Sequence, residues 1–179
     1  DAKSISEAVE IAAKKKEFQP KTKEKIEKEE FLRPFILQFG NVIENNDFSK
    51  AAAIASEVNH LKGVDDEMRQ MLKEVISPLI DKKITELVKN KDGESFVEAF
   101  IRLGRLKNIN VKELGLSEED LRSPEIMKAV KEYLINALEN NSLESFVYNR
   151  DEMVKAGIVD KEEINGLDEI KNHTKEYLI

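Results

Sequence analysis

The chain has 179 residues, of which 36% are charged, and its 29 basic and 36 acidic side chains leave a formal net charge of −7 at pH 7. It contains no cysteine, which excludes thiolate catalysis, disulfide bridges and cysteine-ligated zinc. The acidic balance disfavours a general phosphate binder, and no apolar run approaches the roughly 20 residues of a membrane-spanning helix, so no membrane partner is expected.

Residue usage predicts an all-α fold. Helix-forming residues such as Lys, Glu, Leu, Ile and Ala are abundant, while the chain has only 7 glycines and 4 prolines. Strands would need alternating β-branched residues separated by turn signals such as Asn-Gly, and the sequence has neither pattern.

Residues 1–33 are predicted to form lead-in or capping helices. Ser4 and Glu7 have the spacing of a capping box and open a short amphipathic helix that ends before Pro20. Its apolar stripe consists of Ile5, Ala8, Val9 and Ala12. In residues 21–30 lysines are interleaved with glutamates, which indicates a solvated helix face.

Three sequence features recur in the rest of the chain and predict a helical repeat. One type of helix is expected to begin near Phe48, Phe96 and Phe146. A second type is expected to begin at a proline, because proline is tolerated in the first helical turn; the prolines are Pro34, Pro78 and Pro124. The clusters "ENND", "KNKD" and "ENNS" are expected to form turns, because Asn tolerates a left-handed backbone.

These features define a repeating unit of about 44 to 50 residues. The approximate units are 48–92, 93–141 and 142–179, the last of them truncated, in one continuous domain over residues 34–179. Gly63 and Gly157 are expected to end helices. Asp65 and Asp160 are expected to cap a short helix after each of these glycines.

Each predicted helix has one apolar stripe, which needs a neighbouring helix to bury it. In the first helix type the stripe aligns Ala55, Leu103 and Met153, and then Val58, Leu106 and Ala156. In the second type it aligns Ile80, Ile84, Leu87 and Val88 with Val130, Leu134, Ala137 and Leu138, and Ile126 with Ile170. The sequence therefore predicts antiparallel helix pairs stacked into an α-solenoid with the period of HEAT-type arrays. An irregular compact helical bundle is the alternative.

The sequence "KEYLI" occurs at 131–135 and again at 175–179. The first copy lies within a predicted helix that continues to an Asn-rich turn, so the second copy predicts a helix that continues past Ile179. The first residue is Asp1 in place of Met. Both observations predict that the chain is a fragment of a longer protein.

No catalytic, cofactor-binding or metal site is predicted. His60 and His173 lack the partner three or four residues away that a metal-binding helix face needs. Pairs of neighbouring acidic residues fall in the first turns of predicted helices, where the helix dipole accounts for them. Because a Gly-rich phosphate loop, a nucleophile elbow and EF-hand spacing are also missing, neither an enzyme nor a small-molecule binder is expected.

A departure from the repeat in the third unit suggests a candidate interaction surface. Arg150 occupies a position that is otherwise apolar, and Tyr148 one that is otherwise charged; the counterparts are Ala52, Phe100, Lys50 and Glu98. Either Arg150 lies at the edge of the core with its stem packed and its head in water, or it contacts a partner together with Tyr148. Arg102 and Arg105 either add a basic spot or are simply solvated.

The sequence supports a hypothesis of function only through its architecture. We expect a non-enzymatic module that acts as a protein-interaction scaffold or spacer within a longer protein, with another protein or neighbouring repeats of the same chain as partner. A nucleic-acid-binding module is the alternative, motivated by the lysines from Lys14 to Lys28. The acidic balance and the scarcity of aromatic residues oppose it. The compartment stays open, with the cytoplasm favoured.

Overall fold

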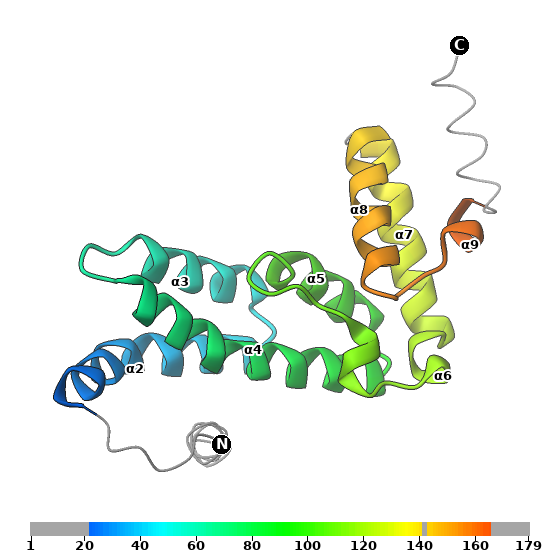
Figure 1. Ribbon diagram of the computed structural model, residues 1–179. Helices are drawn as coiled ribbons and strands as arrows, with labels where there is room; N and C mark the ends of the chain where they lie inside the picture. The colour runs from blue at the N-terminus through cyan, green and yellow to red at the C-terminus, as the bar shows by residue number, and fades with distance from the viewer. Residues whose placement is uncertain (1–21, 141–142, 166–179) are drawn as a thin grey trace. The chain divides into compact units, whose positions relative to one another are not determined.

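The computed structural model describes residues 22–140 and 143–165, and every regular element within these ranges is helical (Figure 1). The prediction of an all-α fold is confirmed. None of the helices in these ranges has both the length and the apolar character of a membrane span. In chain order the elements are α2 (Lys23–Glu44), α3 (Phe48–His60), α4 (Asp66–Lys89), α5 (Gly93–Leu103), the 3-10 helix η1 (Val111–Leu114), α6 (Glu118–Leu121), α7 (Pro124–Asn140), α8 (Leu143–Lys155) and α9 (Lys161–Asn165).

The described residues group into two compact units. Unit 1 contains residues 22–83 and 101–107, and unit 2 contains residues 84–100 and the described residues from 108 onwards. In unit 1, α2 and α3 pack together as a hairpin. In unit 2, α7 and α8 pair in the same way, and α9 contacts α8 (Figure 1).

Two tight turns share one backbone geometry. Asn46, between α2 and α3, and Lys91, between α4 and α5, have left-handed backbone with φ of 59° and 56°. In each turn the following residue is an aspartate whose amide donates to a carbonyl in the preceding helix, at 2.9 Å for Asp47 and 3.0 Å for Asp92. These bonds satisfy carbonyl groups that the helix end would leave without a partner.

The same two aspartates cap the helices that follow. The carboxylate of Asp47 accepts from the amide of Lys50 at 3.1 Å, and that of Asp92 accepts from the amide of Ser95 at 3.2 Å. The prediction that "ENND" and "KNKD" form turns is therefore confirmed. Part of "ENNS" lies outside the described residues.

The apolar positions that the sequence aligned lie in the core. Phe48, Phe96 and Phe146 are each no more than 2% exposed, and Ala55, Leu103 and Met153 are buried equally well. In the next set Leu106 is half-buried, while Val58 and Ala156 are buried. All aligned residues of the second helix type within the described ranges are buried as well: Ile80, Ile84, Leu87, Val88, Ile126, Val130, Leu134, Ala137 and Leu138. Ile170 lies outside those ranges.

Pro34 and Pro78 do not begin helices, so that prediction is wrong for two of the three prolines. Pro34 lies inside α2 and Pro78 inside α4, whereas Pro124 is the first residue of α7. A proline inside a helix costs about 3 kcal/mol because it removes one hydrogen bond and crowds the preceding turn. Tertiary packing outweighs this cost, since buried residues flank both prolines: Leu32, Phe39, Ile43, Leu72, Ile76 and Ile80.

The two helices begin at polar caps upstream of these prolines. The hydroxyl of Thr22 accepts from the amide of Lys25 at 3.3 Å, and α2 then runs across the suggested boundary between residues 33 and 34. The carboxylate of Asp65 accepts from the amide of Met68 at 2.8 Å and begins α4. The predicted cap at Asp65 is confirmed, but the helix that it begins is long, and the short linker helix predicted there is wrong.

Gly63 and Gly157 follow α3 and α8 in left-handed conformation, with φ of 97° and 81°. At the end of α8 the amide of Ile158 donates to the carbonyl of Met153 at 2.9 Å, so the helix end predicted at Gly157 is confirmed. Asp160 directly precedes α9, and its carbonyl accepts from the amide of Ile164 at 3.2 Å. The short helix predicted after Gly157 is therefore present.

Gly93 allows α5 and α7 to approach closely within unit 2. A Cβ at this position would lie 2.3 Å from the carbonyl oxygen of Glu125 and 2.9 Å from the Cβ of Ala129. Both distances are too short for a side chain, so any other residue would force the two helices apart. Because α7 packs on α8, this contact supports the helix that carries Tyr148.

Candidate interaction surface on helix α8

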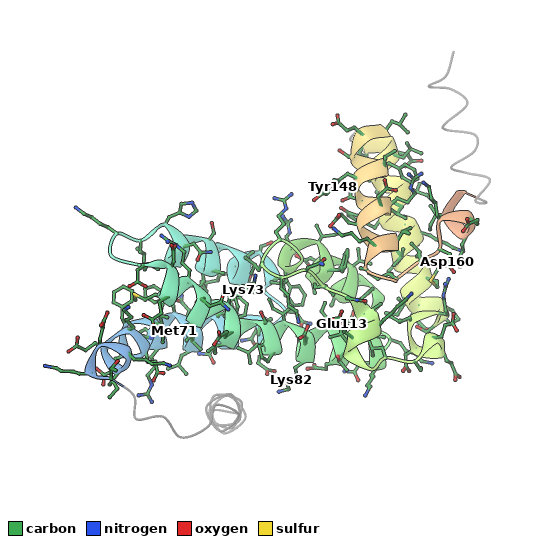
Figure 2. All side chains as sticks on the ribbon, in the orientation of Figure 1. Met71, Lys73, Lys82, Glu113, Tyr148 and Asp160 are labelled. Atoms are coloured by element: carbon green, nitrogen blue, oxygen red, sulfur yellow. The ribbon has the colours of Figure 1, made fainter. Side chains whose placement is uncertain are left out.

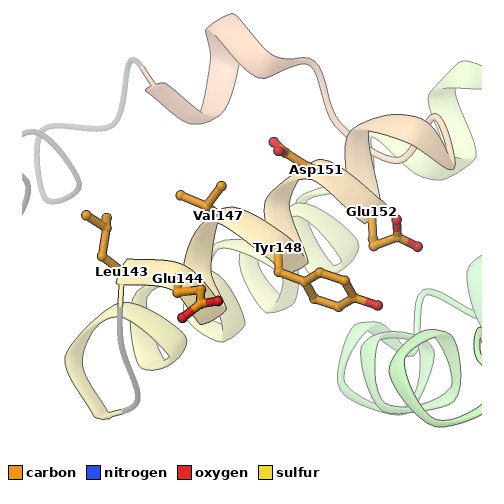
Figure 3. Close-up of a pocket in the computed structure, with 6 residues that line it drawn as sticks. All are labelled: Leu143, Glu144, Val147, Tyr148, Asp151 and Glu152. Atoms are coloured by element: carbon orange, nitrogen blue, oxygen red, sulfur yellow. The ribbon is translucent and has the colours of Figure 1, made fainter.

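The solvent-facing side of α8 forms a shallow pocket whose lining comes from this single helix (Figure 3). The lining residues are Leu143, Glu144, Val147, Tyr148, Asp151 and Glu152. Their spacing of four residues places them in two neighbouring rows, because residues four apart lie one turn above each other. Figure 3 shows Glu144, Tyr148 and Glu152 in one of these rows.

Burial on the other side of α8 determines which residues face the solvent. Phe146 and Met153, seven residues apart, are 2% and 1% exposed and face the core that α8 shares with α7. The pocket residues lie on the remaining surface of the helix. The same spacing that buries the predicted stripe therefore exposes the Tyr148 row.

Tyr148 is the most exposed of the large hydrophobic side chains in the described part of the chain, at 59% (Figure 2). Its ring projects away from the helix, with Glu144 one turn before it and Glu152 one turn after it (Figure 3). Val147, which is half-buried, adds apolar surface in the neighbouring row of the pocket lining. The surface thus combines an aromatic ring with flanking carboxylates.

Arg150 does not project beside Tyr148. Its guanidinium lies over the ring of Phe146, 5.7 Å from the ring centroid, and its Nε donates to the carboxylate of Asp151 at 2.9 Å. The side chain is only 13% exposed. The stem of Arg150 is packed, as one of the two interpretations expected, but its head lies over Phe146 and beside Asp151 and does not extend into water.

Arg102 and Arg105 are exposed, which is compatible both with a basic spot and with simple solvation. Arg102 lies in the last turn of α5, and Arg105 follows the helix. Both residues belong to unit 1, whereas Tyr148 and Arg150 belong to unit 2.

Two lysines of the Lys-rich segment form ion pairs with carboxylates of the same chain. The Lys28 ammonium lies 2.6 Å from Glu67, 2.9 Å from Asp65 and 3.1 Å from Glu24, and its side chain is 15% exposed. Hydrogen bonds to these carboxylates raise the pKa of Lys28 well above its ordinary value. Lys23 lies 3.9 Å from Glu27. Residues 14–21 of the segment lie outside the described residues.

A second ion-pair cluster holds α9 in unit 2. Arg122 donates to Asp160 at 2.7 Å and also binds Glu163 (Figure 2 labels Asp160). Burial alone would lower the pKa of Arg122, but the hydrogen bonds to Glu163 and Asp160 raise it. Asp160 and Glu163 are therefore engaged in structural contacts.

Two residues of the types that metal and acid–base sites use, His60 and Asp120, make local contacts within the described ranges. Within residues 22–140 and 143–165, no group of three His, Cys, Asp or Glu side chains could hold a metal ion. His60 binds the carbonyl of Ser56 in its own helix through Nδ1 at 2.7 Å. Hydrogen bonds from the hydroxyl and amide of Ser117 lower the pKa of Asp120 within a capping box.

Sequence reasoning identified Tyr148 but missed the residues around it. Helical spacing could have identified four of them, because each lies four residues from another pocket residue and away from the Phe146 and Met153 stripe. These residues are Leu143, Glu144, Val147 and Glu152. No protein-family model, curated protein or solved structure matches this chain.

Proposed function

We propose that this chain is a non-enzymatic protein-interaction module, and that its partner binds the exposed side of α8 with basic and apolar side chains. The observation that carries this proposal is Tyr148, which is 59% exposed between Glu144 and Glu152. A tyrosine offers a large contact area for little loss of conformational entropy, and exposed tyrosines are common binding hot spots.

The negative charges that line the α8 pocket indicate the chemistry of the partner. Three carboxylates line the pocket, those of Glu144, Asp151 and Glu152, and they are complementary to Lys or Arg side chains. The ring of Tyr148 and the side chain of Val147 can cover apolar partner atoms. A basic amphipathic helix would meet both requirements, and the small area of one helix face suits weak, transient binding.

We further propose that the helix pairs belong to a stacked repeat array, with a compact helical bundle as the alternative. The support for an array comes from individual turns and core positions. The turns at Asn46 and Lys91 share backbone geometry and capping, and the aligned core positions are buried. Stacked helix pairs expose an extended surface, which suits a scaffold.

The nucleic-acid alternative has less support. A phosphate that approached Lys28 would have to displace carboxylates at 2.6 and 2.9 Å, and Glu24 and Glu27 would repel it. The exposed aromatic side chains that would stack bases are few in the described ranges.

A titration with a defined peptide tests the proposal. The probe is a synthetic amphipathic helix with lysines on both sides of a leucine stripe and one tryptophan, whose fluorescence is unique because the chain has no tryptophan. We expect Tyr148→Ala to weaken binding about tenfold or more, since truncating a hot-spot tyrosine costs at least about 1–2 kcal/mol.

The control is Leu37→Ala, which removes an exposed apolar side chain from α2 in unit 1. It should leave the affinity for the peptide unchanged. The proposal fails if the wild-type chain does not bind this peptide, or if it binds equally well after Tyr148→Ala.

A further inference from the structure

One side of α2 carries a row of four exposed residues, Ile26, Glu30, Arg33 and Leu37. They follow one another at intervals of four, three and four positions, which keeps them on one side of a helix with about 3.6 residues per turn. Ile26 is 44% exposed and Leu37 is 42% exposed, and the two charged residues between them are exposed as well. The row is therefore apolar at both ends and charged in the middle.

The exposed row lies away from the core face of α2. Leu32, Phe39 and Ile43 are buried and pack in unit 1. Phe31 and Phe35 precede Phe39 at intervals of four residues, so they extend the edge of this core face and stand apart from the exposed row. A partner for the exposed row has to match two apolar and two charged side chains.

The spacing and the order of the four residues fit a second copy of the same helix. Intervals of four and three residues are typical of the seam between two coiled helices. In a two-fold symmetric pair, each residue that meets a position of the second copy is met in return by the same position. Ile26 and Leu37 have the same midpoint in the sequence as Glu30 and Arg33. One antiparallel arrangement therefore brings Ile26 against Leu37 of the second copy, and Glu30 against Arg33 of the second copy.

We propose that this chain forms a symmetric antiparallel dimer through the exposed row of α2. Near the two-fold axis a carboxylate meets a guanidinium twice, as Glu30 and Arg33 are exchanged between the copies. At both ends of the row Ile26 and Leu37 cover each other, which removes apolar surface from water. The proposal is independent of the function proposed for α8.

Charge complementarity selects this register. A parallel pair in register would place Glu30 against Glu30 and Arg33 against Arg33, and like charges repel each other. An antiparallel pair shifted by one heptad would place a charged side chain against an apolar one, either Arg33 against Leu37 or Glu30 against Ile26. Of these arrangements, the proposed register alone pairs apolar with apolar and cation with anion.

The contact is small, so the dimer should be weak. Four residues from each copy form its centre, whereas a standard interface has roughly 20–30 residues a side. Charged residues within such a seam lower its stability but fix the register. The dimer should therefore form at high protein concentration and dissociate on dilution.

Sedimentation equilibrium of the full chain tests the proposal. We expect the wild type to form a reversible dimer at concentrations up to about 1 mM. Glu30→Arg should raise the dissociation constant about tenfold or more, because each Arg33 would then face an arginine. Arg33→Glu should have the same effect, because each Glu30 would then face a glutamate. An equimolar mixture of the two variants should form a heterodimer with an affinity close to that of the wild type, because opposite charges then face each other again.

The control variant is Glu57→Arg, which makes the same change of charge at an exposed position of α3 in unit 1. Its dissociation constant should stay close to that of the wild type. The proposal is overturned if the wild type stays monomeric at about 1 mM, or if Glu30→Arg dimerises as well as the wild type. A mixture of the two variants that does not associate would also overturn it. A mixture that binds about tenfold more tightly than the wild type would indicate a parallel pair and contradict the proposed register.

Discussion

At the scale of single residues, Lys28 pairs with three carboxylates. Its ammonium contacts carboxylates from its own helix and from the start of α4, at Asp65 and Glu67. The amide of Met68 and the ammonium of Lys28 lower the pKa of Asp65 below its ordinary value of 3.8. Lys28 therefore fastens α2 to the N-terminal end of α4 within unit 1.

Replacing Lys28 with Gln is expected to lower the urea midpoint of unfolding at neutral pH, because three carboxylates lose their shared cation. The pKa of Asp65 is lower in the folded chain, so its contribution is complete above 3.8 and is lost as the pH falls through the folded pKa. The difference between the variant and the wild type should therefore shrink at about pH 2.

Lys23→Gln is the matched control, since the Lys23 side chain is 93% exposed and lies 3.9 Å from Glu27. Its midpoint should stay close to that of the wild type at both pH values. Equal midpoints for Lys28→Gln and the wild type at neutral pH would show that the cluster does not stabilise unit 1. A difference that persists in acid would rule out Asp65 as its source.

At the scale of helices and turns, local chemistry was predictable and helix length was not. Asp47 and Asp92 cap helices through hydrogen bonds three residues away, so the four-letter clusters around them suffice to predict the turns. The positions of Pro34 and Pro78 inside helices could not be predicted from local sequence. Their penalty is local, but the packing of Phe39 and Ile80 that outweighs it comes from residues distant in sequence.

The α8 surface shows the same limit. The exposure of Tyr148 was predictable, because the aligned positions of the other two predicted repeats carry charged residues, Lys50 and Glu98. The inward turn of Arg150 was left open, because it depends on whether Phe146 and Asp151 can both reach the guanidinium. That answer needs the rotamers of α8, which spacing alone does not provide.

At the scale of the whole molecule, the two proposed architectures differ in size. A compact bundle of this length has a radius of gyration of about 16 Å. We expect X-ray scattering from the monomer to give a larger value, with a pair-distance distribution skewed towards long distances, because stacked helix pairs form an extended particle. A value near 16 Å with a symmetric distribution would favour the compact bundle.

The central claim is that the charges and the ring on α8 recognise a basic amphipathic partner. It is tested most directly by reversing those charges in the double variant Glu144→Lys/Glu152→Lys and titrating it with the lysine peptide and with a matched peptide that has glutamate in place of lysine. The wild type should prefer the lysine peptide, and the variant should prefer the glutamate peptide by about tenfold or more, because charge complementarity is inverted while Tyr148 remains. An unchanged order of affinities in the variant would contradict the claim.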